Sequence, residues 1–135
     1  MNIVIDTNIF FSIMLKKEGF LRNRLLLDLD LNTKFYTCHF LMIEIFKYKE
    51  KIVKQSKMTE EEILEVLYIL LKKIELYNET YISDENYKKA YDLCKNVDVK
   101  DIPFVALTLE LDGKLWTGDK KLKKSLIEQG MDIFY

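Results

Sequence analysis

The sequence predicts an α/β fold in which a parallel β-sheet carries helices on both faces. Short apolar runs, rich in β-branched residues, alternate along the chain with longer amphipathic stretches, an order typical of strands that helices connect. No internal repeat, low-complexity segment or linker interrupts this alternation. The 135 residues are 49% hydrophobic and 32% charged, so we expect residues 1–135 to form a single compact domain.

The strands are predicted from the short apolar runs. The first, Ile3-Val4-Ile5, is apolar and β-branched throughout and therefore indicates a buried strand. Further strands are expected at residues 34–37, 79–83, 114–117 and 132–135. In a parallel α/β sheet the ligand crevice lies at the carboxyl ends of the strands. The residues that follow these runs are therefore the first candidates for a functional site.

The helices are predicted from the periodicity of apolar residues and from end signals. They are expected at residues 9–16, 20–30, 40–54, 59–76, 84–96, 102–111 and 120–129. Thr59 and Glu62 match the capping-box pattern, which indicates the start of a helix. The helix at 102–111 is apolar nearly all round, so it should be buried, and its Pro103 lies in the first turn, where proline is tolerated.

Composition excludes several functional classes. The net charge is −1 and the sequence pI is 5.9, so any contact with nucleic acid must be local. Four glycines cannot supply a glycine-rich phosphate loop, which excludes P-loop and dinucleotide-binding sites. Two cysteines and one histidine give no four-ligand zinc pattern. We expect Cys38 and Cys94 to be reduced and buried.

No targeting or membrane segment is predicted. The N-terminus lacks a basic region followed by a long apolar core. The most apolar stretch, residues 63–76, is interrupted by charged side chains and cannot span a bilayer. We therefore expect a soluble, cytoplasmic protein with no membrane contact.

Acidic residues stand where strands end and helices begin. Asp6 directly follows the first predicted strand, and Asp119 follows the strand at 114–117. Asp101 opens the buried helix, three residues after Asp98. Each of these residues also fits an ordinary role as a turn residue or helix N-cap. The capping roles do not explain why the acids share this placement, which indicates a common site.

Glu44 borders the buried face of a helix. The apolar stripe of this helix consists of Leu41, Ile45, Tyr48 and Ile52. At about 100° per residue, Glu44 lies roughly 60–70° from the mean direction of the stripe, so its carboxylate can face a crevice. A surface glutamate is the alternative. The single histidine, His39, precedes this helix. A metal-free ribonuclease normally needs a matched acid and base, often two histidines, so one histidine argues against that mechanism.

Four segments in a fixed order carry a family resemblance. They are Val4-Ile5-Asp6-Thr7-Asn8, Glu44-Ile45, Asp101-Ile102-Pro103-Phe104-Val105-Ala106-Leu107 and Trp116-Thr117-Gly118-Asp119-Lys120. In order, spacing and chain length they resemble the PIN domain, a family of metal-dependent nucleases. The resemblance extends over essentially the whole chain and implies a single PIN-like nuclease domain.

The resemblance implies a three-layer α/β/α sandwich with a central parallel sheet of four or five strands. It also implies that a set of carboxylates converges, and the members are Asp6, Glu44, Asp101 and Asp119, with Asp98 as a further candidate. Asn8 and Thr117 resemble supporting polar positions in the family. These carboxylates fit Mg²⁺ or Mn²⁺, which are hard cations that take oxygen ligands.

The chemistry implied is metal-dependent endoribonuclease cleavage of RNA phosphodiester bonds, leaving 5′-phosphate and 3′-hydroxyl ends. We assign Asp6 and Asp101 to the principal ion, and Asp119 and Glu44 to completing the site or holding a second ion. Many bacterial and archaeal family members are toxins of toxin–antitoxin pairs, so an antitoxin is an expected partner. Other members process ribosomal or transfer RNA.

Lysines surround the acidic segments in the sequence, at positions 100, 120, 121, 123 and 124. We expect Lys100 and Lys120, which neighbour proposed ligands, to bind RNA phosphates. For Lys123 and Lys124 two alternatives stay open, a phosphate contact and a solvated helix face, and the solvated face is favoured.

Other functions stay open at this point. A non-catalytic PIN-like module that binds RNA or a protein is one alternative, and a flap-processing DNA nuclease, usually a larger protein, is another. A phosphorylated receiver domain would need adjacent acids at the end of the first strand, where only Asp6 is acidic. The long helix at 59–76 is either core or a surface for a homodimer or another partner.

Overall fold

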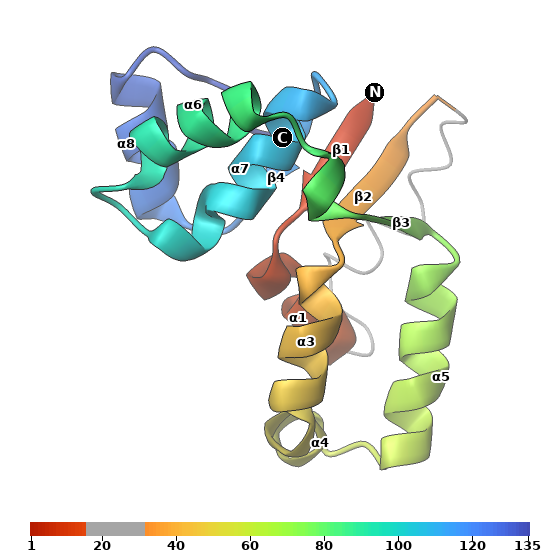
Figure 1. Ribbon diagram of the computed structural model, residues 1–135. Helices are drawn as coiled ribbons and strands as arrows, with labels where there is room; N and C mark the ends of the chain where they lie inside the picture. The colour runs from red at the N-terminus through yellow and green to blue at the C-terminus, as the bar shows by residue number, and fades with distance from the viewer. Residues whose placement is uncertain (16–31) are drawn as a thin grey trace.

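The fold is built on four parallel strands in the order β3-β2-β1-β4 (Figure 1). The computed structural model describes residues 1–15 and 32–135. The strands are β1 (Asn2–Ile5), β2 (Lys34–Cys38), β3 (Ile74–Tyr77) and β4 (Lys114–Trp116). The predicted α/β class with a parallel sheet is therefore confirmed.

Each strand contributes to two hydrophobic cores because successive side chains point to opposite faces of a sheet. Ile3 and Ile5 of β1 belong to one core, and Val4 between them belongs to the other. In β4 the neighbours Trp116 and Leu115 divide in the same way. Burial on both faces explains why these strands are continuous apolar runs in the sequence.

Helices cover both faces of the sheet (Figure 1). On one face lie α1 (Thr7–Leu15), α3 (Phe40–Lys47), α4 (Lys49–Ser56) and α5 (Glu60–Leu71). On the other face lie α6 (Asp84–Cys94), α7 (Ile102–Glu110) and α8 (Lys120–Glu128). Single 3₁₀ turns, η1 (Glu79–Tyr81) and η2 (Val99–Asp101), precede α6 and α7. The three-layer arrangement implied by the resemblance is confirmed.

The prediction that one helix runs over residues 59–76 is wrong at its C-terminal end. The capping box at Thr59 and Glu62 is present and starts α5. The helix ends at Leu71 with the backbone N–H of Lys72 and Lys73 donating to carbonyls three residues back. The chain then becomes β3, which pairs with β2 from Ile74 to Tyr77. Residues 74–77 form a strand because they pair with β2, which is distant in sequence. The periodicity of neighbouring residues cannot predict such a pairing.

Other predicted boundaries also change. The strand expected at 79–83 is wrong, because η1 occupies Glu79–Tyr81. The helix expected at 40–54 is two helices, separated at Tyr48, which is not in helical geometry. The expected last strand is reduced to one bridge between Phe134 and Leu115. The helix expected at 20–30, together with Lys16, lies outside the described residues.

The cysteines agree with the prediction. Cys38 and Cys94 are free and buried. In residues 1–15 and 32–135 no helix combines the length and apolar character needed to cross a membrane.

Candidate metal centre

The alignment of β1 with β4 brings the first two polar groups of the site together. Ile5 pairs with Trp116, so the next residues, Asp6 and Thr117, lie side by side at the carboxyl edge of the sheet. The backbone N–H of Asp6 donates to the Trp116 carbonyl at 3.2 Å. Both side chains are buried, and Asp6 is only 4% exposed.

Asp6 is held by two hydrogen bonds. Its Oδ1 accepts from the backbone N–H of Ile9 at 2.8 Å, as a cap at the start of α1. The side chain of Thr117 also bonds to the carboxylate. Asp6 therefore caps α1 and also lies at the candidate site, so the two interpretations of this residue are compatible.

Asp98 and Asp101 come from the η2 turn that leads into α7. Asp98 Oδ1 accepts from the backbone N–H of Lys100 at 2.9 Å. Asp101 occupies the position before α7 but makes no side-chain cap bond. Its Oδ2 is buried and has no hydrogen-bond partner in the described part of the chain. The capping explanation for Asp101 therefore fails, and one of its oxygens is left without a partner.

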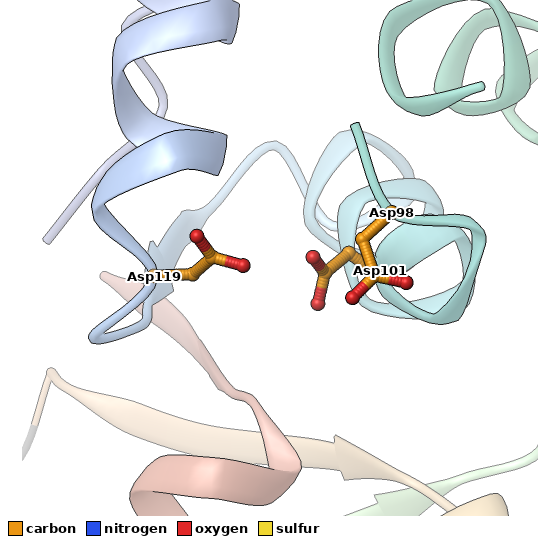
Figure 2. Close-up of side chains that lie close together, drawn as sticks. All are labelled: Asp98, Asp101 and Asp119. Atoms are coloured by element: carbon orange, nitrogen blue, oxygen red, sulfur yellow. The ribbon is translucent and has the colours of Figure 1, made fainter. Parts of the chain in front are cut away.

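Asp119 reaches the same place from the start of α8. It caps the helix, since its Oδ1 accepts from the backbone N–H of Leu122 at 3.0 Å. Figure 2 shows its carboxylate directed toward Asp98 and Asp101. One ligand oxygen from each of these three residues lies within 4.8 Å of the others. We call Asp98, Asp101 and Asp119 the acidic triad.

Glu44 enters from the opposite layer, on α3. Its Oε1 accepts a hydrogen bond from Thr7 Oγ1 at 3.0 Å. Glu44 is partly buried, in agreement with its predicted place at the margin of the buried face. The bond from Thr7 directs its carboxylate toward the edge of the sheet where Asp6 lies.

One small pocket of about 80 Å³ joins these groups. It is lined by Asp6, Thr7, Asn8, Glu44, Asp98, Lys100, Asp101, Phe104 and Asp119. The pocket thus brings together all five predicted carboxylates, with Asn8 and Lys100. Thr117 is not a lining residue, but its side chain bonds to Asp6. Lys120, predicted with Lys100, is exposed and is not among the lining residues.

The electrostatics of the pocket favour a bound cation. Burial, followed by the negative charges of Asp98, Asp119 and Asp6, raises the pKa of Asp101 to about 7. Burial also raises the pKa of Asp6, against the hydrogen bonds from Thr117 and Ile9. Carboxylates that repel one another in a partly dehydrated pocket keep a proton unless positive charge replaces it.

The donor set fits a hard divalent cation. Every ligand group of the triad is a carboxylate oxygen, as Mg²⁺, Mn²⁺ and Ca²⁺ prefer. The buried, unpartnered Oδ2 of Asp101 is a group whose desolvation a cation would offset. Asp6 and Glu44 lie outside the triad but line the same pocket. The three ligand residues of the triad are all aspartates, so the fit to a hard cation rests on carboxylate oxygens alone.

The sequence predicts no separate role for Thr7, which belongs to the first motif and orients Glu44 through its hydroxyl group. For Lys123 the sequence favours a solvated helix face over a phosphate contact, yet the side chain is partly buried and its charge favours the ionised form of Asp6. Its spacing of four residues from Asp119 is a signal that could have indicated this, because such residues share a helix face.

Comparisons with known proteins agree with this architecture. A chain of VapBC2 from Rickettsia felis, crystallised bound to a DNA fragment from their promoter, is similar with a TM-score of 0.71 and 18% identity, over 92% of each chain. A chain of VapBC-1 from nontypeable Haemophilus influenzae has a TM-score of 0.66 and 17% identity, over 95% of this chain and 94% of that one. At such identities the likeness is one of fold. No curated protein matches.

The sequence itself carries the family signal. The model of the PIN domain family matches residues 4–130, a span that contains every member of the acidic pocket. The chain therefore belongs to the PIN domain family.

Proposed function

We propose that this PIN domain is a metal-dependent endoribonuclease whose acidic pocket holds Mg²⁺ or Mn²⁺. Two observations carry the proposal: one carboxylate oxygen from each member of the acidic triad lies within 4.8 Å of the others, and Asp101 Oδ2 is buried with no hydrogen-bond partner among the described residues. Asp98, Asp101 and Asp119 form a group whose ligand oxygens lie within 4.8 Å of one another. We therefore propose these three residues as ligands of the principal ion, in place of the Asp6 and Asp101 pair that the sequence suggested. Asp6 and Glu44 complete the site, directly or through water.

The residues around the triad have distinct tasks in this proposal. A divalent ion bound there would supply a Lewis acid for the phosphoryl oxygen and lower the pKa of a water molecule. Thr117 and the N–H of Ile9 hold Asp6 in place, and Thr7 holds Glu44. Lys100 lines the pocket as a cation and would bind a phosphate of the RNA backbone.

The metal site is tested by calorimetric titration of Mn²⁺ into the wild type, Asp101→Asn and Asp119→Asn. We expect the wild type to bind and both variants to lose at least tenfold in affinity. Asp92→Asn, an exposed change on α6, is the matched control and should bind like the wild type. Equal affinity in all four proteins would remove the triad as the metal site.

Ribonuclease activity is tested separately with labelled single-stranded RNA and branched DNA. We expect Mn²⁺-dependent cleavage of the RNA that stops with a chelator and in Asp101→Asn. Binding of Mn²⁺ without cleavage of any RNA would favour the non-catalytic module, and cleavage of the branched DNA alone would favour a DNA nuclease.

We further infer that the chain acts as the toxin of a toxin–antitoxin pair. Two chains of the same fold come from the structures of VapBC-1 and of VapBC2, the latter bound to a DNA fragment from their promoter. Complexes of this kind fit the family pattern of toxin and antitoxin. These likenesses support a protein partner for this chain without identifying it.

An apolar groove between α3–α4 and α5 is a suitable surface for that partner. Its volume is about 320 Å³, and the apolar side chains that line it are Met42, Ile45, Phe46, Ile52, Val53, Ile63, Leu64 and Leu67. Phe46 is 84% exposed, and an ion pair between Lys49 and Glu60 at 2.7 Å crosses the rim. Contiguous exposed apolar surface of this kind is typical of an interface.

Expression in a bacterial host tests the toxin role. We expect growth arrest when the chain is induced alone, none with Asp101→Asn, and recovery when the product of the adjacent gene is co-expressed. Phe46→Ser should keep the arrest and weaken the recovery. Cleavage of RNA in vitro without growth arrest would indicate a processing enzyme, and a dimeric mass by light scattering that Phe46→Ser abolishes would assign the groove to a homodimer.

A further inference from the structure

The start of α3, the helix that carries Glu44, is capped from a distant part of the chain. The residue before the helix, His39, makes no side-chain cap bond. Instead the backbone N–H of Phe40 donates to Oε1 of Glu79 at 2.7 Å, although the two residues are 39 positions apart. A carboxylate there satisfies an N–H that has no partner within the helix and meets the partial positive charge of the helix N-terminus. Glu79 therefore holds the end of α3 that lies one turn before Glu44.

The main chain of Glu79 is bound to the other layer of the fold. Its carbonyl accepts a hydrogen bond from Tyr87 Oη, on α6, at 3.1 Å. α6 leads into the η2 turn, where the backbone N–H of Asp98 donates to the Cys94 carbonyl at 3.1 Å. In Figure 1 the segment between β3 and α6, which contains η1, passes close to the start of α3. Glu79 thus joins the helix that carries Glu44 to the helix that leads to the acidic triad.

The distance between Glu44 and the acidic triad depends on such indirect contacts. Among the described residues, the side chain of Glu44 bonds to Thr7 of its own layer, and no hydrogen bond or ion pair joins it to the triad. Carboxylates repel one another, so their separation is set by how the elements that carry them are held. A displacement of about 1 Å in a catalytic group can cost about 100-fold in rate. A contact that fixes α3 relative to α6 therefore affects the chemistry of the pocket.

We propose that Glu79 is a positioning residue of the site, which sets the place of the Glu44 carboxylate relative to the acidic triad by capping α3 and binding α6. The inference rests on the proposed function of the pocket and adds a residue that lies outside its lining. Glu79 contacts neither the substrate nor the metal ion in this proposal and acts only through Glu44.

The competing explanation is that Glu79 only stabilises the fold, as any helix cap does. A cap of that kind contributes to stability and leaves the pocket unchanged. Thr59 provides the matched control, because its Oγ1 caps α5 by accepting from the backbone N–H of Glu62 at 3.2 Å. α5 carries none of the residues that line the pocket.

The test is a double-mutant cycle between Glu79 and Glu44 in the full chain. Glu79→Ala, Glu79→Gln, Tyr87→Phe and Thr59→Ala are each made in the wild type and in Glu44→Gln. Mn²⁺ affinity is measured by calorimetry, and kcat and KM are measured by cleavage of a labelled single-stranded RNA. Urea denaturation reports the stability of every variant.

We expect Glu79→Ala to lower kcat about 5- to 10-fold and Mn²⁺ affinity about two- to fivefold, less than residues that bond directly to a metal ligand, because Glu79 acts through a helix. KM should stay within about twofold, since Glu79 does not contact the substrate. In Glu44→Gln the same change should have no further effect, because the carboxylate that Glu79 positions is gone.

The remaining variants separate positioning from stability. Glu79→Gln should restore most of the loss, since its amide oxygen can still accept the bond from Phe40. Tyr87→Phe should cause a smaller loss that also disappears in Glu44→Gln. Thr59→Ala should lower the urea midpoint as Glu79→Ala does, with kcat and Mn²⁺ affinity unchanged.

Equal losses from Glu79→Ala in the wild type and in Glu44→Gln would overturn the inference, as would an equal loss of kcat in Thr59→Ala. Unchanged kcat and Mn²⁺ affinity in Glu44→Gln would also overturn it, because no group would then need positioning. If the wild type cleaves RNA in any of these cases, the proposed nuclease function stands and only the role of Glu79 fails. If the wild type cleaves no RNA but Mn²⁺ affinity follows the expected cycle, the role of Glu79 stands and the nuclease function fails. If the wild type neither binds Mn²⁺ nor cleaves RNA, both proposals are wrong.

Discussion

Asp101 is the residue of the pocket with the least support from its surroundings. Asp6, Asp98 and Asp119 each accept a hydrogen bond from a backbone N–H. Asp101 makes no such cap bond, and its Oδ2 is buried without a partner in the described part of the chain. Its carboxylate therefore destabilises the metal-free protein when ionised.

The first prediction concerns stability without metal. The pKa of Asp101 rises from 3.8 in the unfolded chain to about 7 in the folded protein. The folded state then holds a proton that the unfolded state has lost, so the free energy of unfolding falls as pH rises from about 4 to about 7. Asp101→Asn removes this loss. Asp101→Asn should therefore raise the free energy of unfolding, relative to the wild type, by roughly 1–2 kcal/mol more at pH 8 than at pH 5, after allowance for solvent screening.

Urea denaturation in a chelator at both pH values measures this difference. Asp92→Asn, an exposed change, should alter stability equally at pH 5 and pH 8. A stabilisation by Asp101→Asn that does not depend on pH would contradict the raised pKa as its cause.

The second prediction concerns Thr7, which orients Glu44 through its hydroxyl at 3.0 Å. Thr7→Val keeps the shape of the side chain and removes the donor. A hydrogen bond to a charged group contributes about 1.5–3 kcal/mol, and the partly exposed Glu44 keeps some of that through water. We expect kcat to fall about 5- to 10-fold while thermal stability changes little. Thr7→Ser should retain activity, and an unchanged kcat in Thr7→Val would show that Glu44 needs no such support.

At the scale of elements, the site is assembled where helices begin. Asp6 caps α1, Asp98 caps η2 and Asp119 caps α8. The N-terminus of a helix carries a partial positive charge, which stabilises a nearby carboxylate by typically 0.3–1 kcal/mol, as a rough estimate. The same backbone bonds fix the orientation of each carboxylate, so the pocket is arranged before an ion enters.

The third prediction concerns the turn between α7 and β4. Gly113 closes this turn by donating to the Thr108 carbonyl at 3.0 Å. A Cβ atom at Gly113 would lie 2.4 Å from the backbone oxygen of Asn2, so β1 would have to move away from the turn. We expect Gly113→Ala to destabilise the protein by about 2 kcal/mol or more in urea denaturation.

Gly118→Ala is the control for that change. A Cβ atom there would lie 3.9 Å from Ile9 Cδ1, which is an ordinary contact, so we expect a loss below about 1 kcal/mol. Equal losses for the two variants would mean that the general cost of replacing glycine, and not the approach to Asn2, explains the result.

At the scale of the whole molecule, the sheet couples two cores. Leu107 of α7 is fully buried in the core on one face, and Trp116 of β4 packs into the core on the other. Both cores include residues of β1, Val4 on one side and Ile3 on the other. Loss of packing on one face should therefore weaken the entire fold.

The fourth prediction tests this coupling. We expect Leu107→Ala to lower the free energy of unfolding by about 2–5 kcal/mol through the cavity that it leaves. Trp116 fluorescence and far-UV circular dichroism should still report one coincident transition. Separate transitions would mean that the two cores unfold independently.

Local patterns predicted most of the elements and the placement of the acids. Ile3-Val4-Ile5 is apolar enough to be a strand wherever it packs, and Thr59 with Glu62 starts a helix through bonds within four residues. Asp6 and Asp119 were predicted at strand ends because the chain turns directly after each strand. Such features depend on neighbours in sequence, so the residues alone indicate them.

The sequence by itself determined the α/β class, the core-facing strands and a set of acids able to meet at one sheet edge. Only the tertiary structure decided that Ile74–Tyr77 is a strand and that Asp98 belongs to the acidic triad. The pKa of about 7 at Asp101 and the partial burial of Lys123 were decided in the same way. The physical reason is that each depends on atoms from distant parts of the chain, through strand pairing, exclusion of water or mutual repulsion, which no local pattern records.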